Sequence, residues 1–285
     1  MNIDTIHIPR MFLFDVDGPI VDLKSEKVTQ IAILKRIAAE LHSQRPIALV
    51  TGRATSWLID NVVSQIENLV LDPNDLKYLF ISAEFGGASI TYDDGSRHVH
   101  TDPTIGIPTA LTEFCEELLK SKFSLHMDFE KKETQFTVKI RKGSDLAAFN
   151  LDRVNFVEAV RDHLDLSGLS EHYEVHNDRV AVNIRDKREN KVFATEQVLN
   201  WVIQKRIEPE SFVIFGDSIG DFEIADAIID NELVQEHDYP VRFIYLGVKE
   251  DVQDLIKADP GYEIDVRTNE DLTLGTLEVL NELPL

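Results

Sequence analysis

The feature that most constrains the fold of this chain is a pattern that occurs three times along it. A short, wholly apolar run ends abruptly at a polar residue, and a segment with helical spacing follows; the runs are Met11–Phe14, Ile47–Val50 and Phe212–Phe215. Continuous apolar runs of this length are typical of strands buried on both faces, as in a parallel sheet. Because these strands alternate with helices, the pattern predicts a doubly wound α/β core.

The segments after the three runs carry apolar residues at every third or fourth position, and they are 25–42, 54–68 and 221–230. Further strands are expected at 78–82 and 241–246. In sheets of this kind, ligands bind beyond the carboxyl ends of the strands. We therefore expect the polar residues that end the runs, Asp15, Thr51 and Asp217, to meet at one crevice although they lie far apart in sequence.

The middle of the chain, residues 88–186, has a different pattern, in which strand-like stretches surround two helix-like ones. The expected strands are 88–92, 124–130, 135–141, 173–176 and 180–184, and the expected helices are 108–121 and 146–165. This predicts an antiparallel α+β module inserted into the core, with hinges at Gly86-Gly87 and within 185–190. The predicted core therefore comprises residues 1–87 and 187–285.

The charge and composition of the chain exclude several classes of protein. Lys and Arg number 29 against 51 Asp and Glu, and the net charge of −22 disfavours binding to nucleic acid or to an anionic membrane surface. A single cysteine, Cys115, allows neither an intrachain disulfide nor a cysteine-based metal site. Since no apolar run is long enough for a membrane span and the first residues lack the features of a secretory signal, we expect a cytoplasmic protein.

The first chemical motif is a pair of carboxylates, Asp15 and Asp17, directly after the first run. Two acids this close repel each other unless a cation joins them, and their oxygens suit a hard divalent ion such as Mg²⁺. The first carboxylate could attack a phosphorus centre, and the second could give and take protons. The alternative is an ordinary acidic turn after a strand, in which Gly18 lets the backbone bend sharply.

Two more motifs follow the other runs. Thr51 and Gly52 offer a hydroxyl and backbone amides at the start of a helix, which suits a phosphoryl oxygen, although Thr51 could simply cap that helix. Asp217 and Asp221 place two more acids after a buried strand, where they could bind metal or merely favour the helix N-terminus. Because all three motifs are expected at one edge of one sheet, we interpret them together as a catalytic site.

The order of these motifs resembles the haloacid dehalogenase-like superfamily of phosphohydrolases. The matching motifs are Asp-x-Asp-Gly at 15–18, Thr-Gly-Arg at 51–53, a lysine, and Gly-Asp-x-x-x-Asp at 216–221. The insertion before the lysine resembles the C2B type of cap in that superfamily. The resemblance implies that Asp15 is the nucleophile, which becomes an aspartyl-phosphate, and that Asp17 is the general acid/base.

The resemblance also implies which residues hold the substrate and the metal. Thr51 would hold the phosphoryl group that is transferred, and Gly52 and Arg53 would complete the phosphate site. The Mg²⁺ ligands would come from Asp15, the backbone carbonyl of Asp17, Asp217 and Asp221.

Two lysines, Lys187 and Lys191, lie near the position of the superfamily's lysine. Lys191 matches better, because it comes seven residues after Ile184 and opens a helical segment. Its ammonium would offset the negative charge of the nucleophile and the phosphate. We expect Lys187 to be a surface residue. One departure is Pro19, where the superfamily usually has Thr, and we expect a locally altered loop there.

The inserted module resembles that of trehalose-6-phosphate phosphatases, which carry Glu-x-Lys and, nine residues after that lysine, an Arg. Here these residues are Glu130, Lys132 and Arg141, and the resemblance implies that they bind a sugar. A charged, solvent-facing strand edge is the alternative. Three positions depart from that family, which has His, His and Glu where this chain has Phe85, Lys139 and Asn183. A different phosphorylated sugar or a polyol is therefore an alternative substrate.

We therefore predict a Mg²⁺-dependent phosphatase that acts on a small phosphorylated metabolite, foremost a sugar phosphate similar to trehalose 6-phosphate, through an aspartyl-phosphate on Asp15. A phosphomannomutase-like phosphomutase on the same fold is one alternative, since it would return the phosphoryl group to a sugar. A non-catalytic sugar-binding protein is another. It predicts the loss of some of the four acids, yet all of them are present in the chain.

Overall fold

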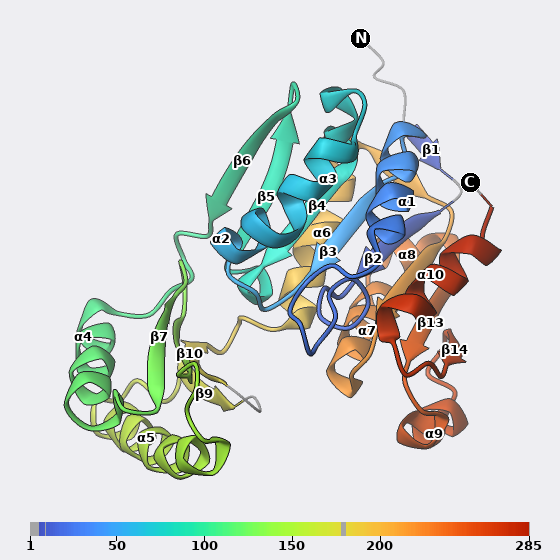
Figure 1. The fold of residues 1–285 in the computed structure, drawn as a ribbon. Coiled ribbons are helices and arrows are strands. Elements are labelled where there is room, and N and C mark those ends of the chain that lie inside the picture. The colour runs from blue at the N-terminus through green and yellow to red at the C-terminus, as the bar shows by residue number, and fades with distance from the viewer. Residues whose placement is uncertain (1–5, 9, 178–180, 285) are drawn as a thin grey trace. The chain divides into compact units, whose positions relative to one another are not determined.

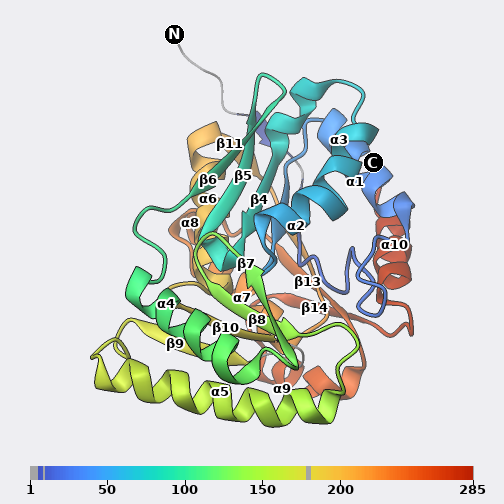
Figure 2. The ribbon, with the colours of Figure 1, turned by 60° about the vertical axis from the view of Figure 1, so that its left-hand side comes forward.

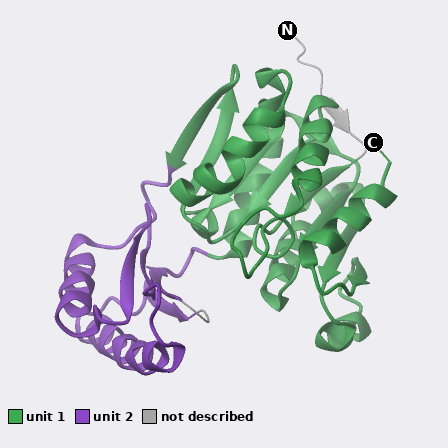
Figure 3. Cartoon of the chain, in the orientation of Figure 1, with its two compact units in different colours: residues 1–100, 190–285 green, residues 101–189 purple. Residues whose placement is uncertain are grey.

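The computed structural model describes residues 6–8, 10–177 and 181–284 (Figure 1). The chain divides into two compact units, and the second is inserted into the first along the sequence (Figure 3). Unit 1 comprises Met1–His100 and Asn190–Leu285, and unit 2 comprises Thr101–Glu189. Each unit has its own sheet and its own apolar core.

Unit 1 contains an eight-stranded sheet of order β14-β13-β12-β2-β3-β4-β5-β6. Its strands are β2 (Met11–Phe14), β3 (Ile47–Val50), β4 (Leu79–Ala83), β5 (Ala88–Asp93), β6 (Ser96–Thr101), β12 (Phe212–Gly216), β13 (Val241–Leu246) and β14 (Glu263–Arg267). The strands from β14 to β4 run parallel, whereas β5 is antiparallel to β4. Every residue of β2, β3 and β12 is buried, as expected of strands covered on both faces.

Helices cover both faces of this sheet (Figure 1). On one face, α1 (Ile31–His42) packs against α3 (Ser64–Leu69) and α10 (Leu272–Glu282). On the other face, α6 (Lys191–Lys205) packs against α7 (Phe222–Ile229). Helix α2 (Thr55–Leu58) continues through a π-helical turn (Ile59–Val63) into α3. Unit 1 also contains the α-helices α8 (Glu232–His237) and α9 (Lys249–Ala258). The predicted doubly wound α/β core is confirmed.

The helix predicted over 25–42 begins only at Ile31, because the residues before it form a closed loop. The Asp22 carboxylate accepts hydrogen bonds from the backbone N–H and the hydroxyl of Ser25, both at 2.7 Å. The Asp22 N–H donates to the Lys27 carbonyl at 2.9 Å. Such side-chain and turn hydrogen bonds compete with helix formation, and apolar periodicity alone does not reveal them.

Unit 2 is an antiparallel sheet of order β7-β8-β10-β9 with two helices on one face (Figure 2). Its elements are α4 (Thr109–Leu118), β7 (Met127–Lys131), β8 (Phe136–Ile140), α5 (Leu146–Leu166), β9 (Tyr173–Asn177) and β10 (Ala181–Asp186). Side chains alternate across the sheet. Phe136 and Val138 lie in the core with Phe156 of α5, whereas Thr137 and Lys139 belong to the face without helices. The predicted α+β character of the inserted module is confirmed.

Unit 2 begins at Thr101 and ends at Glu189, and both boundaries come later in the sequence than the predicted ones at 88 and 186. Strands β5 and β6 form a hairpin that pairs with β4, so it extends the sheet of unit 1. All residues of β6 are exposed, and the sequence therefore lacks the apolar alternation that would have marked a strand of the core sheet. Val180, the first residue of the strand predicted at 180–184, lies outside the described residues.

The last residue of unit 2, Glu189, is a fully buried carboxylate. Its Oε1 accepts hydrogen bonds from the Thr134 hydroxyl at 2.5 Å and from the Gln135 amide at 3.1 Å. Its Oε2 accepts from the backbone N–H of Asp186 at 3.0 Å. These bonds tie the segment after β10 to the loop between β7 and β8.

A separate two-stranded parallel sheet in unit 1 joins β1 (Ile6–Ile8) to β11 (Ile207–Pro209). It links the start of the described chain to the segment just before β12. Across the described residues, no helix combines the length and the apolarity that crossing a bilayer requires.

Candidate active site

Three adjacent strands of the unit 1 sheet bring the predicted motifs together. β2 lies between β12 and β3 and is parallel to both. Asp15 follows β2, Thr51 follows β3, and Asp217 follows β12. Because the carboxyl ends of parallel strands meet at one edge of the sheet, all three residues lie at that edge, as the sequence pattern predicted.

The acids of the first and third motifs form a compact cluster. One carboxylate oxygen from each of Asp15, Asp217 and Asp221 lies within 4.8 Å of the other two. Asp15 is 6% exposed and Asp221 is 0% exposed. Residues more than 200 positions apart in sequence therefore place three acids in one largely buried site.

The ammonium group of Lys191 is the cationic partner of this cluster. Its Nζ donates to Asp15 Oδ1 at 2.9 Å and also to Asp221 Oδ1. Lys191 is the first residue of α6, and the side chain of Asn190 caps that helix by accepting from the Phe193 N–H at 2.8 Å. The cap sets where the helix starts and therefore where Lys191 stands.

The other candidate lysine, Lys187, is exposed and belongs to unit 2. This is the surface position that the sequence predicted for Lys187.

Asp221 supports the cluster through both of its oxygens. Its Oδ1 faces Lys191, and its Oδ2 accepts from the Asp217 N–H at 2.9 Å and from the N–H and hydroxyl of Ser218, both at 2.8 Å. These bonds shape the turn after β12. Since Asp221 uses both oxygens in the protein itself, Asp15 and Asp217 are the acids best placed to bind a cation.

The pKa values of the clustered groups record their burial and their mutual repulsion. Burial, and then the neighbouring charge of Asp221, raise the pKa of Asp217 to about 7. Burial also raises the pKa of Asp15 well above its usual range, and the attraction of Lys191 only partly offsets this. For Lys191, burial lowers the pKa, but the attraction of Asp15 and Asp221 outweighs it and the net shift is upward.

The donor set fits a hard divalent cation. Three carboxylates face one ammonium, so the cluster has an excess of negative charge that such an ion would relieve. Carboxylate oxygens are the ligands that Mg²⁺ prefers in proteins. The side chain of Asp17 lies outside this cluster of three acids because it is engaged elsewhere.

Gly18 allows the first motif to approach the third. Its φ of +89° lies in the left-handed region. A β-carbon at this position would come within 2.5 Å of Asp217 Cγ. Pro19 has no N–H to donate, but hydrogen bonds of its neighbours close the loop. The Gly18 N–H donates to the Val21 carbonyl, and the N–H groups of Ile20 and Val21 donate to the Val16 carbonyl.

Asp17 is held by Arg53 of the second motif. Arg53 Nε donates to Asp17 Oδ2 at 2.9 Å, and Arg53 Nη2 donates to Asp17 Oδ1 at 2.6 Å. The guanidinium also stacks on the ring of Trp57, with 4.2 Å between its central carbon and the ring centroid. The sequence predicted that Arg53 binds the substrate. It holds no signal for the pairing of Arg53 with Asp17.

Phe85 covers the second motif, a contact that the sequence did not predict. A β-carbon on Gly52 would lie 2.4 Å from two carbons of the Phe85 ring. Glu84 and Phe85 both have left-handed φ angles, 52° and 53°. Their N–H groups donate to the carbonyls of Arg53 at 3.1 Å and Thr51 at 3.0 Å, and these long-range bonds hold the strained segment in place.

The predicted sugar-binding residues lie in unit 2, on or beside the β7–β8 hairpin, and each has a different partner. Glu130 pairs with Lys139 at 2.5 Å. Lys132 Nζ donates to the Gln135 and Asn183 side-chain oxygens, both at 3.2 Å, and Arg141 Nη2 pairs with Asp128 at 2.6 Å. Lys139 and Asn183 are two of the positions at which this chain departs from the family. They contact Glu130 and Lys132, respectively, which are residues to which the resemblance assigned sugar binding.

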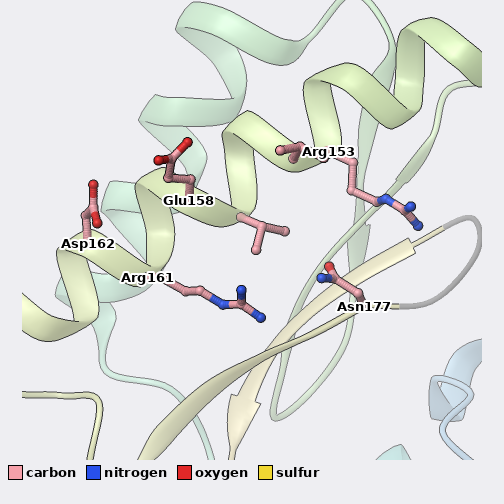
Figure 4. A pocket seen from close by; sticks show the side chains of 7 residues that line it. Arg153, Glu158, Arg161, Asp162 and Asn177 are labelled. Carbon is pink, nitrogen blue, oxygen red and sulfur yellow. The ribbon is translucent and has the colours of Figure 1, made fainter.

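A hollow of about 500 Å³ on unit 2 is lined by none of the predicted site residues. Arg153 and Arg161 extend from α5 toward Asn177 at the end of β9, while Glu158 and Asp162 point away from it (Figure 4). Its lining mixes both signs of charge on mostly exposed side chains, which is typical of a solvated helix face.

No protein-family model and no curated protein matches this sequence. The fold, however, matches solved structures. The C-terminal domain of trehalose-6-phosphate phosphatase from C. albicans aligns over 100% of both chains, with a TM-score of 0.65 and 18% identity. A haloacid dehalogenase-like hydrolase from Bacteroides thetaiotaomicron aligns over 95% of this chain and 100% of its own, with a TM-score of 0.60 and 10% identity. The chain has the haloacid dehalogenase-like fold.

A third solved structure that matches this chain is that of a nucleotidase. IMP-bound IMP-nucleotidase from Plasmodium falciparum aligns over 96% of this chain and 69% of its own, with a TM-score of 0.54 and 11% identity. The resemblance that the motifs suggested is thus confirmed at the level of the fold, with both the core and the inserted α+β unit covered.

Proposed function

We propose that this chain is a metal-dependent phosphatase that releases inorganic phosphate from a small phosphorylated metabolite. The observation that carries the proposal is the cluster at the end of β2, where Asp15 shares a buried site with Asp217, Asp221 and Lys191. A carboxylate nucleophile needs nearby cations, because both it and its phosphate target are negatively charged. The named phosphatase and nucleotidase of this fold, which act on small phosphorylated molecules, support the same reaction class.

In this proposal the reaction has two steps. A carboxylate oxygen of Asp15 attacks phosphorus, and the bond from phosphorus to the leaving oxygen breaks as that oxygen takes a proton from the carboxylic acid of Asp17. The Asp17 carboxylate then removes a proton from water, whose oxygen attacks the phosphorus. The bond between phosphorus and Asp15 breaks, and inorganic phosphate leaves.

The remaining residues of the site bind and neutralise the phosphoryl group. Lys191 balances the charge of Asp15 throughout, since its Nζ lies 2.9 Å from Asp15 Oδ1. Thr51 and Gly52 offer a hydroxyl and a backbone amide beside β2. A divalent cation, for which we propose Mg²⁺, would be held by Asp15 and Asp217 and would stabilise charge on the phosphoryl oxygens.

We further propose that unit 2 acts as the cap that selects the substrate and that the substrate is a sugar phosphate. The face of its sheet without helices is polar, and it carries Glu130, Lys132 and Asn183. Carboxylate, ammonium and amide groups together can both accept from and donate to sugar hydroxyls. The exchange of the family's glutamate for Asn183 favours a sugar or polyol other than trehalose.

The experiment that tests this function measures phosphate release from p-nitrophenyl phosphate with and without Mg²⁺. Asp15→Asn should abolish release, because an amide is not a competent nucleophile. The matched control is Asp93→Asn, an exposed aspartate of unit 1 paired with Lys205, which should keep full activity. Unchanged turnover in Asp15→Asn would refute the assignment of the nucleophile. If the wild-type protein is active, a panel of phosphorylated sugars and polyols ranks its substrates.

A further inference from the structure

The guanidinium of Arg53 is fixed from several directions at once. Its Nε and Nη2 reach both oxygens of Asp17, and its Nη1 and Nη2 lie 3.4 Å from Glu26 Oε1. Its flat face rests on the Trp57 ring. The side chain of Arg53 is only 16% exposed, so it has little freedom to leave this position.

The backbone of Arg53 is fixed as well. Its N–H donates to the Thr51 hydroxyl at 3.2 Å, and its carbonyl accepts from the Glu84 N–H at 3.1 Å. Arg53 therefore reaches Asp17 from an anchored loop after the neighbouring strand β3. Glu26 and Trp57 also contact the guanidinium, so its position does not depend on Asp17 alone.

We propose that Arg53 is a positioning residue, which orients the Asp17 carboxyl for proton transfer to the leaving oxygen. This inference rests on the proposed phosphatase function. Arginine suits the role because its planar fork presents two parallel N–H groups to the two oxygens of a carboxylate, whereas a lysine ammonium is a single point of charge. Without the fork, the partly exposed Asp17 side chain, at 29%, is free to take other rotamers.

A positioning role and direct substrate binding by Arg53 predict different kinetics. Loss of a substrate-binding residue raises KM, with kcat unchanged if ground state and transition state bind equally. Loss of a residue that orients Asp17 slows both proposed steps, but only the first step involves the leaving group, and kcat/KM reports that first step. The loss in kcat/KM is therefore larger for leaving groups that need a proton. p-Nitrophenolate is stable without a proton, whereas the alkoxide of a sugar or glycerol is not, so the two substrate classes separate these roles.

The test compares p-nitrophenyl phosphate, phenyl phosphate and the best alkyl phosphate substrate in wild type, Arg53→Gln and Arg53→Lys. We expect kcat/KM to fall less than about tenfold for p-nitrophenyl phosphate and about 100-fold or more for the alkyl phosphate. Arg53→Lys should show the same trend. Arg97→Gln, which removes a surface arginine paired with Glu67, is the control and should leave every rate unchanged.

A double-variant comparison makes the test sharper. If Arg53 acts through Asp17, adding Arg53→Gln to Asp17→Asn should cost little more than Asp17→Asn alone. Equal losses in kcat/KM for all leaving groups, a rise in KM at unchanged kcat, or full additivity with Asp17→Asn would overturn the positioning role while leaving the phosphatase intact. Lack of hydrolysis by the wild-type protein overturns both proposals. If Arg53→Gln does not fold, the same kinetic comparison with the wild type is made with Arg53→Lys.

Discussion

Replacing Asp217 by Asn should stabilise the protein in the absence of metal at neutral pH, although it removes a proposed cation ligand. Burial and the charge of Asp221 raise the pKa of Asp217 from 3.8 to about 7. Between these values the folded protein binds more protons at this site than the unfolded chain does. Stability contributed by this site therefore falls as pH rises through that window, and the full cost of the ionised carboxylate is present above it.

The size of the effect follows from the same shift. A rise from 3.8 to about 7 corresponds to about 4 kcal/mol, at 1.36 kcal/mol per pKa unit. This is an upper bound, because the surrounding groups relax around the charge. Asn keeps the shape without the charge, so we expect Asp217→Asn to raise the free energy of unfolding of unit 1 by about 1–4 kcal/mol near pH 8 and by roughly zero near pH 4.

The assay is chemical unfolding in EDTA at several values between about pH 4 and pH 8. Asp93→Asn is the matched control with the opposite sign. The hydrogen bond from Lys205 lowers the pKa of Asp93, so this exposed acid contributes slight stability at high pH that is lost as pH falls. The reasoning would be refuted if Asp217→Asn were no more stable than the wild type near pH 8. It would also be refuted if the gain in the free energy of unfolding did not change with pH.

Two further substitutions test the packing of the site and of unit 2. Gly18→Ala should lower the free energy of unfolding by about 1–3 kcal/mol and weaken Mg²⁺ binding in calorimetry, because the new β-carbon is strained at φ +89° and collides with Asp217. Glu189→Ala should destabilise unit 2 by about 1–3 kcal/mol in chemical unfolding, because Thr134 and Gln135 each lose a buried acceptor.

Each of these substitutions has a control within the chain. Gly143 has a similar φ of +86° but open space around its missing β-carbon, so Gly143→Ala should cost only the backbone strain, about 1 kcal/mol. An equal cost at Gly18 would contradict the clash. Glu189→Gln retains a carbonyl acceptor and should cost less than Glu189→Ala; equal stability of Glu189→Ala and wild type would show that the buried carboxylate holds nothing in place.

The residues that the sequence located best are those whose position follows from strand ends. Asp15, Thr51 and Asp217 follow continuous apolar runs, and such runs are typical of parallel strands that are buried on both faces. The edge strand β14 was not predicted, because it is only partly buried. Without an apolar alternation, periodicity does not reveal such strands.

The contacts that the sequence did not reveal are those made by loops. Arg53 and Asp17 are 36 residues apart, and their pairing depends on two loops whose shape comes from individual hydrogen bonds rather than from a repeating pattern. The contact of Phe85 with Gly52 depends on two consecutive non-glycine residues in the left-handed region. Propensity disfavours that conformation, so only the assembled structure shows it.

The division of the chain at His100 and Asn190 has a consequence for how this protein can be altered. Asp15, Thr51, Lys191 and Asp217 all belong to the outer two segments, and Lys191 comes just after the second junction. Residues 101–189 can thus be exchanged for a foreign insert, or shortened to a bridge, without deleting any member of the charged cluster. Under the proposed function, the residues for hydrolysis and the residues for substrate selection then lie on separate stretches of the polypeptide, and either set can be altered without changing the other.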